Sequence, residues 1–544
     1  MSAWNFADVW EAIAAKTPNR PALVQGERVV TWAGFNQHAD ALARAFLAAG
    51  MGHQAKVAAF LYNGPDYLET YFAAFKAGMA PVHTNYRYGA EELYYLFDNA
   101  DAEAVVFHAS FAPVLEEIRD RLSKVKLWVC APEAGYPVPS WAKDYQALTE
   151  QAGARAVGPW GRSGDDLLLL YTGGTTGMPK GVMWRQDDLF NVLGAGGNAN
   201  LEVPPLERVE DAADRLTDPD EPSPFRQLVA CPLMHGTGQF SAFITLNMGG
   251  SVASLPSRKF DPVELWNEVE RLKASTVVIV GPAFASPMLD CLNANPGRWD
   301  LSSVNLISSS GAVWSQENKQ GLLAHIPGAM LYDSLGSSEA VGLGGSTSAA
   351  GAEVQTARFV LGPTVAVFTE EGKRVLPGSG ERGLVAVTGF IPIGYYKDPE
   401  KSAKTFRIFE GERWSVPGDF AEVEADGELK LLGRGSQVIN TGGEKVFPEE
   451  VEEALKKHPT VSDAVVVGVP DARFGERICA VVDIKPGHEA PSLAVLAAHV
   501  RSHLADYKAP RELVLAPIIR AANGKVDVKG IRQHALQALG LTPS

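Results

Sequence analysis

The feature that most constrains this chain is an apolar run that leads directly into a loop of glycine and threonine. Residues 167–170 are four consecutive leucines, a pattern typical of a strand that is buried on both faces. Residues 171–181 then read YTGGTTGMPKG, which combines four glycines and three threonines with Lys180. Glycine lets backbone N–H groups converge on an anion, while hydroxyls add donors and lysine adds positive charge. The segment therefore predicts a phosphate cradle rather than a surface turn, although it lacks the spacing of a Walker A loop.

Helical and strand-like patterns alternate on both sides of this loop. Helices are predicted over 39–49 and 67–76, and buried strands over 57–61, 105–107, 276–280 and 304–307. This alternation predicts an α/β fold in which helices flank parallel-type sheets. The acidic, proline-containing residues 206–227 interrupt the alternation and predict a solvated surface insertion, with a lid over a site as the alternative.

The pattern changes from about residue 360 to short strands separated by glycine-rich turns. A helix over 448–457 and a strand over 464–467 follow. We therefore predict a large N-terminal domain over 1–434 that includes a β-subdomain, and a small, mobile α+β C-terminal domain over 435–544.

Composition excludes several classes of protein. The chain has 544 residues, of which 46% are apolar and 21% charged, as in globular proteins of two or more domains. A formal net charge of −15 argues against a nucleic-acid partner, which would need clustered Lys and Arg. The four cysteines form no C-x-x-C pair and indicate a reducing compartment. Residues 1–10 lack the features of a signal peptide, and no apolar run approaches the roughly 20 residues of a membrane span. We expect a cytoplasmic protein.

Two further segments carry oxygen ligands that suit a nucleotide. Residues 332–339 read YDSLGSSE, which places hydroxyls in a turn before Glu339, a carboxylate suited to Mg²⁺. Taken alone, this segment is better explained as a helix cap. Residues 414–420 read WSVPGDF, where Asp419 can accept hydrogen bonds from a ribose diol or can simply belong to a turn.

Three other segments become informative only in combination. Arg434 in LGRGSQVINTGGEK (432–445) has forked donors for ribose and phosphate, and neighbouring glycines would let one domain turn against the other. Lys525 in RAANGKVD (520–527) lies on a loop tip, where a lone lysine is usually a surface residue. His235 in PLMHGTG (232–238) is, alone, more often a hydrogen-bonded core residue.

Taken together and in this order, these segments resemble one family, the adenylate-forming (AMP-binding) enzymes. The resemblance extends from TPNRPA at 17–22 to Lys525. The phrases YTGGTTGMPKGVMW, DSLGSSE, IPIGYYKD and GRGSQVINTGGEKVFPEEVE are similar to bacterial fatty-acyl-CoA ligases and to the branch that activates steroid side-chain acids. The resemblance implies an acid–thiol ligase of lipid metabolism or steroid degradation that uses ATP, Mg²⁺ and CoA. Such an enzyme converts a hydrophobic carboxylic acid to acyl-AMP with release of pyrophosphate, and then transfers the acyl group to CoA.

The resemblance also implies roles for individual residues. The pyrophosphate grip consists of Thr172, Gly173, Gly174, Thr175, Thr176, Gly177 and Lys180. The contacts to adenine, ribose and α-phosphate are Gly311, Ala312, Asp333, Ser334, Leu335, Gly336, Ser337, Ser338, Asp419 and Arg434. Within this set, Asp333 sits where the family hydrogen-bonds the adenine amino group, and Leu335 replaces the usual stacking aromatic residue.

The remaining implied roles concern the metal, the acid and the second half-reaction. Glu339 binds Mg²⁺, and Lys525 bridges the substrate carboxylate and the α-phosphate. The acyl pocket includes His235, Gln239, Phe240 and Gly281. The CoA tunnel includes Gly442, Gly443 and Glu444, and Ser436 is the hinge between the domains.

The sequence also leaves room for other functions. An amino-acid-activating or carrier-loading adenylation domain commonly has an Asp in its pocket, whereas residues 234–246 contain no acidic side chain. An enzyme for aryl acids and a non-catalytic nucleotide-binding regulator also remain open. The three retained charged residues Lys180, Glu339 and Lys525 disfavour the regulator.

The acid itself is not determined by the sequence. The segment around Phe240, Phe243 and Ile244 predicts a hydrophobic pocket, with Val280 and Gly281 opposite. Medium-chain, long-chain, aromatic and steroid side-chain acids all remain as substrates. A homodimer is expected only from the family resemblance.

Overall fold

Two sheets with parallel strands form the larger part of the protein. The computed structural model describes residues 4–174, 177–216, 221–312, 314–352, 358–434, 437–441, 444–471, 475–504, 506–521 and 526–541. The chain divides into two compact units, of which the first comprises Met1–Val354 and Val387–Ser415 and the second comprises Gln355–Ala386 and Val416–Ser544. The predicted boundary at 434 and 435 falls within the second unit, and it stays a prediction together with the Ser436 hinge, which lies outside the described residues.

The first sheet of the first unit has the strand order β2-β1-β11-β10-β12-β13-β14-β15. Its strands are β1 (Pro21–Gln25), β2 (Arg28–Thr31), β10 (Arg226–Val229), β11 (Ser251–Ser254), β12 (Thr276–Ile279), β13 (Leu306–Ser310), β14 (Met330–Ser337) and β15 (Ala340–Ser348). The strands from β1 through β14 pair in parallel, and β15 returns antiparallel to β14. A sheet of this kind gathers the carboxyl ends of its strands at one edge, where ligands of open α/β folds bind.

The second sheet of the first unit has the order β19-β9-β8-β4-β3-β5-β6-β7. Its strands are β3 (Lys56–Phe60), β4 (Ala80–His83), β5 (Ala102–His108), β6 (Leu127–Ala131), β7 (Lys143–Asp144), β8 (Leu167–Gly174), β9 (Gly177–Arg185) and β19 (Gly394–Tyr395). The leucine run lies in β8, between β4 and β9, and residues 168–170 are buried as their apolar pattern predicted. A short hairpin of β20 (Phe406–Phe409) and β21 (Glu412–Ser415) completes the strands of this unit.

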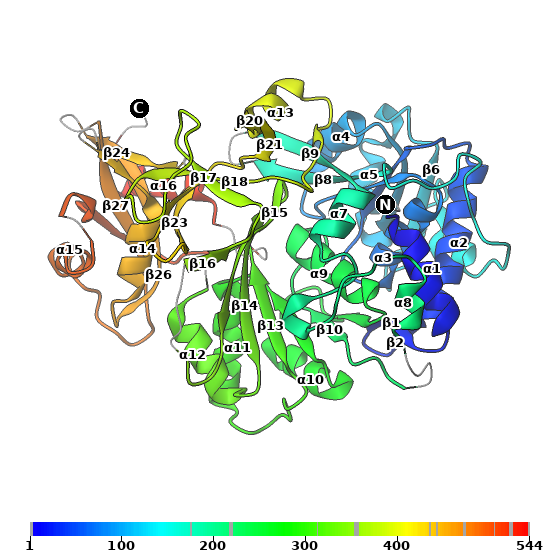
Figure 1. Cartoon of the computed structure of the whole chain (residues 1–544), viewed down its shortest axis with the longest axis horizontal. Helices are drawn as coiled ribbons and strands as arrows, with labels where there is room; N and C mark the ends of the chain where they lie inside the picture. Colours follow the sequence, from blue (N-terminus) through cyan, green and yellow to red (C-terminus); the bar gives the residue numbers. More distant parts are fainter. Residues whose placement is uncertain are drawn as a thin grey trace. The chain divides into compact units, whose positions relative to one another are not determined.

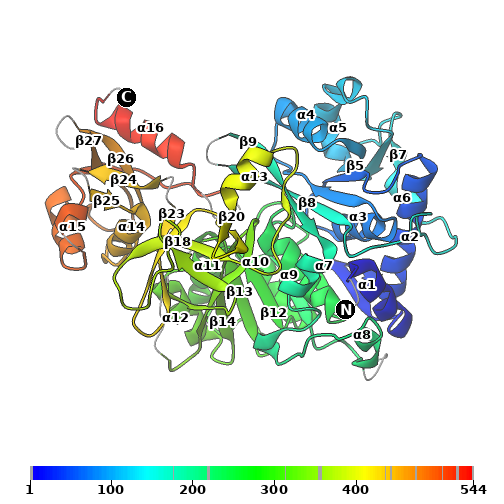
Figure 2. The ribbon, with the colours of Figure 1, turned by 45° about the horizontal axis from the view of Figure 1, so that its top comes forward.

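Helices cover these sheets and fill the space between them (Figures 1 and 2). They are α1 (Phe6–Lys16), α2 (Trp32–Ala48), α3 (Pro65–Lys76), α4 (Ala90–Asn99), α5 (Ala112–Glu116), α6 (Tyr145–Thr149), α7 (Gln186–Val192), α8 (Asp211–Asp214), α9 (Gly236–Asn247), α10 (Pro262–Leu272), α11 (Pro282–Ala294), α12 (Gln316–His325) and α13 (Pro399–Thr405). Helix α9 packs on β10, β11 and β12, α3 packs on β3 and β4, and α1 contacts both helices. These three helices therefore form a layer between the two sheets.

This helical layer contains a fully buried aromatic cluster. The ring of Phe243 from α9 lies 5.1 Å from Phe6, 5.4 Å from Trp10 and 6.0 Å from Phe75, measured between ring centroids. Aromatic rings bury large apolar areas, so this cluster stabilises the contact between α1, α3 and α9. The expectation that Phe243 lines a pocket is wrong, because its side chain is part of this core.

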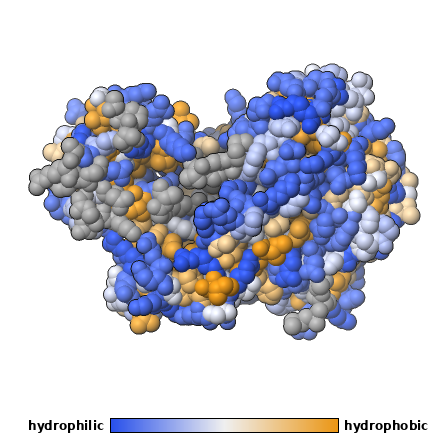
Figure 3. Space-filling model, turned by 90° about the horizontal axis from the view of Figure 1, so that it is seen from above, coloured by the Kyte–Doolittle hydropathy of each residue, from blue (hydrophilic) through white to orange (hydrophobic). Residues whose placement is uncertain are grey.

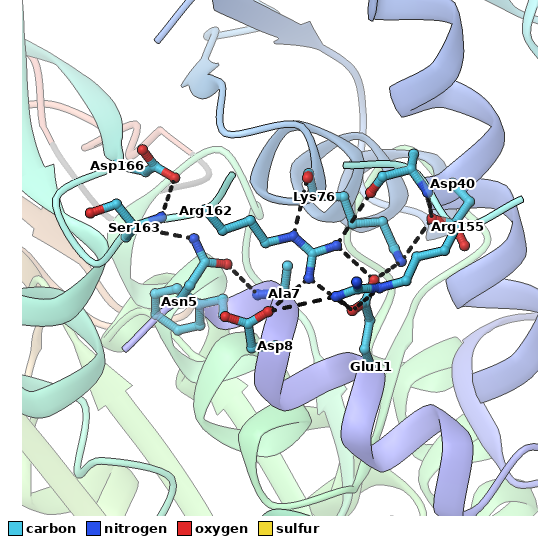
Figure 4. Close-up of polar contacts among 12 residues, drawn as sticks. Asn5, Ala7, Asp8, Glu11, Asp40, Lys76, Arg155, Arg162, Ser163 and Asp166 are labelled. Atoms are coloured by element: carbon cyan, nitrogen blue, oxygen red, sulfur yellow. Dashed lines mark hydrogen bonds and ion pairs between the residues drawn. The ribbon is translucent and has the colours of Figure 1, made fainter. Parts of the chain in front are cut away.

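Buried charges join α1 and α3 to each other and to α2 (Figure 4). Lys76 of α3 is fully buried and forms ion pairs with Glu11 of α1 and with Asp40 of α2. Arg162 contributes two further ion pairs, at 2.8 Å to Glu11 and 2.8 Å to Asp8. Burial would raise the pKa of Glu11, but Arg162, Arg155 and Lys76 outweigh it and lower the pKa to about 2. Each buried charge therefore has an opposite charge beside it, as burial requires.

Most predicted elements of the first unit are present. Helix α3 ends at Lys76, before Gly78 with φ +63°. Helix α2 begins earlier than predicted because the Thr31 side chain caps it by accepting the Gly34 N–H. Within the solvated insertion predicted over 206–227, charged residues such as Glu207 and Arg208 are exposed, whereas Leu206, Ala212 and Leu216 are buried.

The second unit contains two smaller bodies of sheet. One is antiparallel and contains β16 (Arg358–Leu361), β17 (Val365–Phe368), β18 (Arg382–Val387), β22 (Asp419–Val423) and β23 (Leu429–Arg434). The other contains β24 (Ile439–Thr441), β25 (Glu444–Val446), β26 (Val461–Asp471), β27 (Gly475–Ile484) and β28 (Glu512–Leu515), with helices α14 (Pro448–Lys456), α15 (Leu493–Arg501) and α16 (Val528–Ala538). Alternate residues of β26 pack into two cores, one with α14 and α15 and the other with α16, as the predicted α+β pattern requires.

Side chains on the face shown in Figure 3 are mostly hydrophilic, and apolar ones gather only in small patches. In the described part of the chain, no helix combines the length and apolar character needed to cross a bilayer. The four cysteines are free thiols and are buried.

Candidate active site

Most of the predicted phosphate cradle lies in β8 and β9, which pair antiparallel. Thr172 lies opposite Lys180, and Gly174 lies opposite Gly177 across the hairpin. Gly181 is required in β9 because a Cβ at this position would lie 2.7 Å from the ring of Tyr171. The backbone of Gly173 is described, whereas Thr175 and Thr176 lie outside the described residues, so their role stays a prediction.

Ser338 and Glu339 form the turn between β14 and β15. The segment is thus a β-hairpin turn, and the helix-cap interpretation is wrong. Three hydrogen bonds hold this turn: Tyr395 donates its hydroxyl to Glu339 Oε1 at 2.8 Å, Trp184 donates Nε1–H to the Ser338 carbonyl at 2.9 Å, and Ser415 donates its hydroxyl to the Glu339 carbonyl at 2.5 Å.

These contacts join the carboxylate turn to the phosphate hairpin. Trp184 lies in β9, and Tyr395 lies in β19, where it pairs with Val182 of β9. The structure therefore places the turn that carries Glu339 against β9, the strand that carries Lys180, and against its neighbour β19. Sequence inspection did not find Trp184 or Tyr395 as site residues, although the IPIGYYKD phrase that contains Tyr395 contributed to the resemblance.

The residues predicted to contact adenine lie at the carboxyl edge of the first sheet. Ile279, Ser309 and Asp333 are neighbours across the parallel strands β12, β13 and β14. Gly281 follows β12, and its N–H donates to Ser309 Oγ at 2.9 Å. A Cβ at Gly281 would lie 2.7 Å from the Cβ of Ala312, so these two chain segments touch.

The N-terminus of α9 reaches the same edge. Gly311 has φ +86°, and a Cβ added there would lie 3.8 Å from Thr237 Oγ1 of α9 and 3.6 Å from Val280. His235 is the N-terminal cap residue of this helix. The predicted acyl-pocket segment and the predicted adenine segment therefore adjoin, which is the arrangement that joining a carboxylate to a nucleotide requires.

The two faces of α9 differ. Gln239 is buried on the face that packs into the helical layer, where its Nε2 donates to the Tyr67 hydroxyl at 3.2 Å. Thr237, Ser241 and Ile244 recur at helical spacing and are partly exposed. This partly exposed face is the part of α9 that is accessible to a ligand, and the roles of Gln239 and Phe240 in an acyl pocket stay predictions.

Asp333 forms a buried ion pair at the site. Its Oδ2 forms an ion pair with Lys319 Nζ from α12, and the two side chains are only 9% and 1% exposed. Burial raises the pKa of Asp333, although Lys319 acts in the opposite direction. Sequence inspection did not find Lys319, because nothing local distinguishes it from a surface lysine. The contact of Asp333 with adenine stays a prediction, as do those of Ser334, Leu335 and Gly336, which continue β14.

The second unit holds the residues predicted to bind ribose. Asp419 begins β22 and Arg434 ends β23, and the two residues are direct partners across these antiparallel strands. Asp419 is 9% exposed. Glu444 begins β25, while Gly442, Gly443, Ser436 and Lys525 lie outside the described residues.

A Gly- and Thr-rich hairpin, a carboxylate turn beside it and an open edge of parallel strands define a nucleotide-binding enzyme of the α/β class. Residues 10–396 match the AMP-binding enzyme family, and residues 450–525 match the AMP-binding enzyme C-terminal domain. The chain therefore belongs to the AMP-binding enzyme family.

Relatives of the chain are named as CoA ligases. It is 38% identical, over 97% of its own length and 96% of the relative, to a medium/long-chain-fatty-acid–CoA/3-oxocholest-4-en-26-oate–CoA ligase of Mycolicibacterium smegmatis. It is 39% identical, over 100% of its length and 97% of the relative, to the 3-oxocholest-4-en-26-oate–CoA ligase of Rhodococcus rhodochrous. These similarities confirm the predicted class, an AMP-forming acid–thiol ligase that uses ATP, Mg²⁺ and CoA.

Solved structures confirm the fold class. The structure of an anthranilate CoA ligase in complex with anthranoyl-AMP superimposes with a TM-score of 0.81, covers 99% of both chains and is 23% identical in sequence. At this level of identity the similarity concerns the fold alone.

Proposed function

We propose that this enzyme activates a large hydrophobic carboxylic acid, either a fatty acid or the side-chain acid of a steroid. The observation that carries the proposal is the similarity, at 38% and 39% identity over nearly the whole of both chains, to ligases named for these acids. The partly exposed face of α9 supports it, because Ile244 and the methyl group of Thr237 offer apolar contact, while aromatic side chains fill the opposite face. The cytoplasmic location and the homodimer stay predictions.

In the first half-reaction, a carboxylate oxygen of the acid attacks the α-phosphorus of ATP, and the bond to the β,γ-pyrophosphate breaks. Both reactants are anionic, so fixed donors and positive charge must stabilise the transition state. We assign Lys180 and the hairpin backbone to the leaving pyrophosphate, and Ser338 and Lys525 to the α-phosphate where the new bond forms.

Glu339 suits the Mg²⁺ that accompanies ATP. Mg²⁺ is usually held by one or two carboxylates together with substrate phosphates. Glu339 together with phosphate oxygens is a donor set of this kind, and we assign the cation to it. Next to it, Ser337 Oγ is buried and lacks a hydrogen-bond partner among the described residues, as expected of a group that serves a ligand. When bound, the cation supplies positive charge to the phosphates.

In the second half-reaction, the CoA thiol attacks the acyl carbon, the carbon–oxygen bond to AMP breaks, and the thiol proton leaves to solvent or a base. Phosphate is a far better leaving group than the original carboxylate oxygen, which is the chemical reason for adenylation. We assign Gly442, Gly443 and Glu444 to the pantetheine of CoA. We assign Ser436 to the hinge about which the C-terminal domain turns between the two half-reactions.

A screen for CoA-dependent release of AMP tests this proposal. The purified enzyme, with Mg²⁺ and ATP, is given a medium-chain acid, a long-chain acid, an aryl acid and 3-oxocholest-4-en-26-oate in turn. Release with the fatty or steroid acids and a requirement for CoA are expected. Preference for the aryl acid would overturn the proposed substrate class, and no release with any acid would favour the nucleotide-binding regulator.

A further inference from the structure

Lys180 provides the only positive side chain of the segment 171–181, and an acidic side chain already contacts it. Asp398 Oδ2 lies 2.5 Å from Lys180 Nζ. The two side chains are 29% and 39% exposed, so solvent and ligands can reach this ion pair. An anion that binds at the hairpin tip therefore competes with Asp398 for the same ammonium group.

The position of Asp398 is fixed by its own backbone environment. Asp398 is the N-cap residue of α13, and its Oδ1 accepts the N–H of Lys401 at 2.9 Å. One carboxylate oxygen thus caps the helix, while the other faces Lys180. Figures 1 and 2 both show α13 beside β9.

The chain that precedes Asp398 is anchored to the phosphate hairpin. The Tyr396 N–H donates to the carbonyl of Gly181, the residue after Lys180, at 2.8 Å. Lys397 adopts φ +56°, a left-handed conformation that non-glycine residues rarely adopt and that persists where surrounding contacts enforce it. Its ammonium is held by Asp101 at 2.7 Å. The carboxylate of Asp398 is therefore placed beside Lys180 by contacts on both sides.

We propose that Asp398 is a positioning residue that competes with the phosphates for Lys180 and so weakens the grip of the hairpin on pyrophosphate. A fixed negative charge next to the ammonium opposes a second anion there by Coulomb repulsion. Pyrophosphate is the product of the first half-reaction, so a built-in competitor for the lysine that binds it favours its release. The inference extends the proposed function of Lys180.

The variant Asp398→Asn tests the charge without removing the helix cap, because Asn and Asp are comparable N-cap residues. Exposed ion pairs are worth about 0.2–1 kcal/mol, so the dissociation constant of Mg²⁺-pyrophosphate should fall up to about fivefold. The KM for ATP should fall in parallel, while the KM for CoA should not change. Direct binding of inorganic pyrophosphate to the full-length protein, measured by calorimetry, needs no acid substrate. It therefore distinguishes failure of this inference from failure of the proposed function.

Glu400→Gln is the matched control. Glu400 lies in the first turn of the same helix and pairs with Lys404 at 2.6 Å, so this variant removes the same charge without touching the Lys180 ion pair. Its pyrophosphate binding should equal that of the parent enzyme. Unchanged or weaker binding in Asp398→Asn would overturn the inference, and so would equal tightening in Glu400→Gln. If Asp398→Asn does not fold, Asp398→Ser keeps a capping side chain and gives the same comparison.

Discussion

Removing the positive charge behind Asp333 should change which nucleotide the enzyme uses. Lys319 and Asp333 form a buried ion pair, and burial already raises the pKa of the carboxyl. In Lys319→Met the positive charge that lowers the pKa of Asp333 is lost, so this pKa rises further. Asp333 then stays protonated up to a pH closer to neutral. An ionised carboxylate accepts a hydrogen bond from the adenine amino group, whereas a protonated carboxyl can donate to the carbonyl oxygen of guanine.

The magnitude follows from the kind of bond that is lost. A hydrogen bond to a charged group contributes about 1.5–3 kcal/mol, so kcat/KM for ATP should fall about 10- to 150-fold. The value for GTP should fall less, which lowers the ATP-to-GTP ratio. Breaking a buried pair also costs stability, about 3–5 kcal/mol when the remaining charge stays ionised.

The pH dependence has a definite sign. In the variant, the folded-state pKa of Asp333 lies above its unfolded value, so the protonated carboxyl stabilises the fold at low pH. That contribution is lost as the pH rises through the raised folded-state pKa. Urea unfolding of Lys319→Met should therefore show a defect that grows with pH.

Steady-state kinetics with ATP and GTP across this pH range, next to the charge-preserving Lys319→Arg, decide the matter. Lys319→Arg should retain the preference for ATP. A folded Lys319→Met protein that is less stable yet discriminates ATP from GTP as well as the parent would refute the role of Asp333 toward adenine.

Three other perturbations test separate parts of the site and its scaffold. Lys525→Ala should nearly abolish acid-dependent pyrophosphate formation but largely spare thioester formation from supplied acyl-AMP. Equal loss of the two half-reactions would contradict the assignment of Lys525 to the first step. Tyr395→Phe removes the hydroxyl that donates to Glu339, and loss of a hydrogen bond to a metal ligand weakens metal binding. The Mg²⁺ concentration for half-maximal activity should therefore rise about tenfold. An unchanged Mg²⁺ titration would argue against Glu339 as the ligand. Lys76→Met leaves Asp40 without its ion-pair partner, while Glu11 keeps Arg162 and Arg155 (Figure 4). Because Asp40 becomes a buried, unpaired charge, the unfolding free energy should fall by about 3–5 kcal/mol in urea titrations, and a loss below about 1 kcal/mol would show that the Lys76–Asp40 pair is not buried in solution.

Local patterns predicted the elements that depend on local physics. The leucine run predicted β8 because a strand between two neighbours is apolar on both faces. The predicted strand over 304–307 lies at 306–310 instead, because Ser308 and Ser309 pair with both β12 and β14, and Ser310 pairs with β14, despite their polarity. Ser309 holds the segment after β12 in place, because its Oγ accepts the Gly281 N–H. Apolar periodicity cannot reveal a role of this kind.

The site contacts that were missed join residues far apart in the chain. Lys180 and Asp398 are separated by 218 positions, and their meeting depends on the pairing of β19 with β9. Motif inspection found Lys180 because a Gly- and Thr-rich loop has a recognisable composition. It could not find Asp398, since an acidic residue before Pro399 is explained fully by capping of a helix.

One short segment, residues 395–398, thus acts on two charges of opposite sign. Tyr395 holds the Glu339 carboxylate that suits Mg²⁺, and Asp398 holds the Lys180 ammonium that suits pyrophosphate. We expect the first contact to strengthen the hold on the nucleotide phosphates and the second to weaken it. An enzyme that must bind ATP and then release pyrophosphate needs both effects, because uniformly tight binding of substrate and product does not accelerate turnover. Because Tyr395 in β19 and Asp398 at the start of α13 contact charges of opposite sign, Tyr395→Phe and Asp398→Asn should shift pyrophosphate affinity in opposite directions.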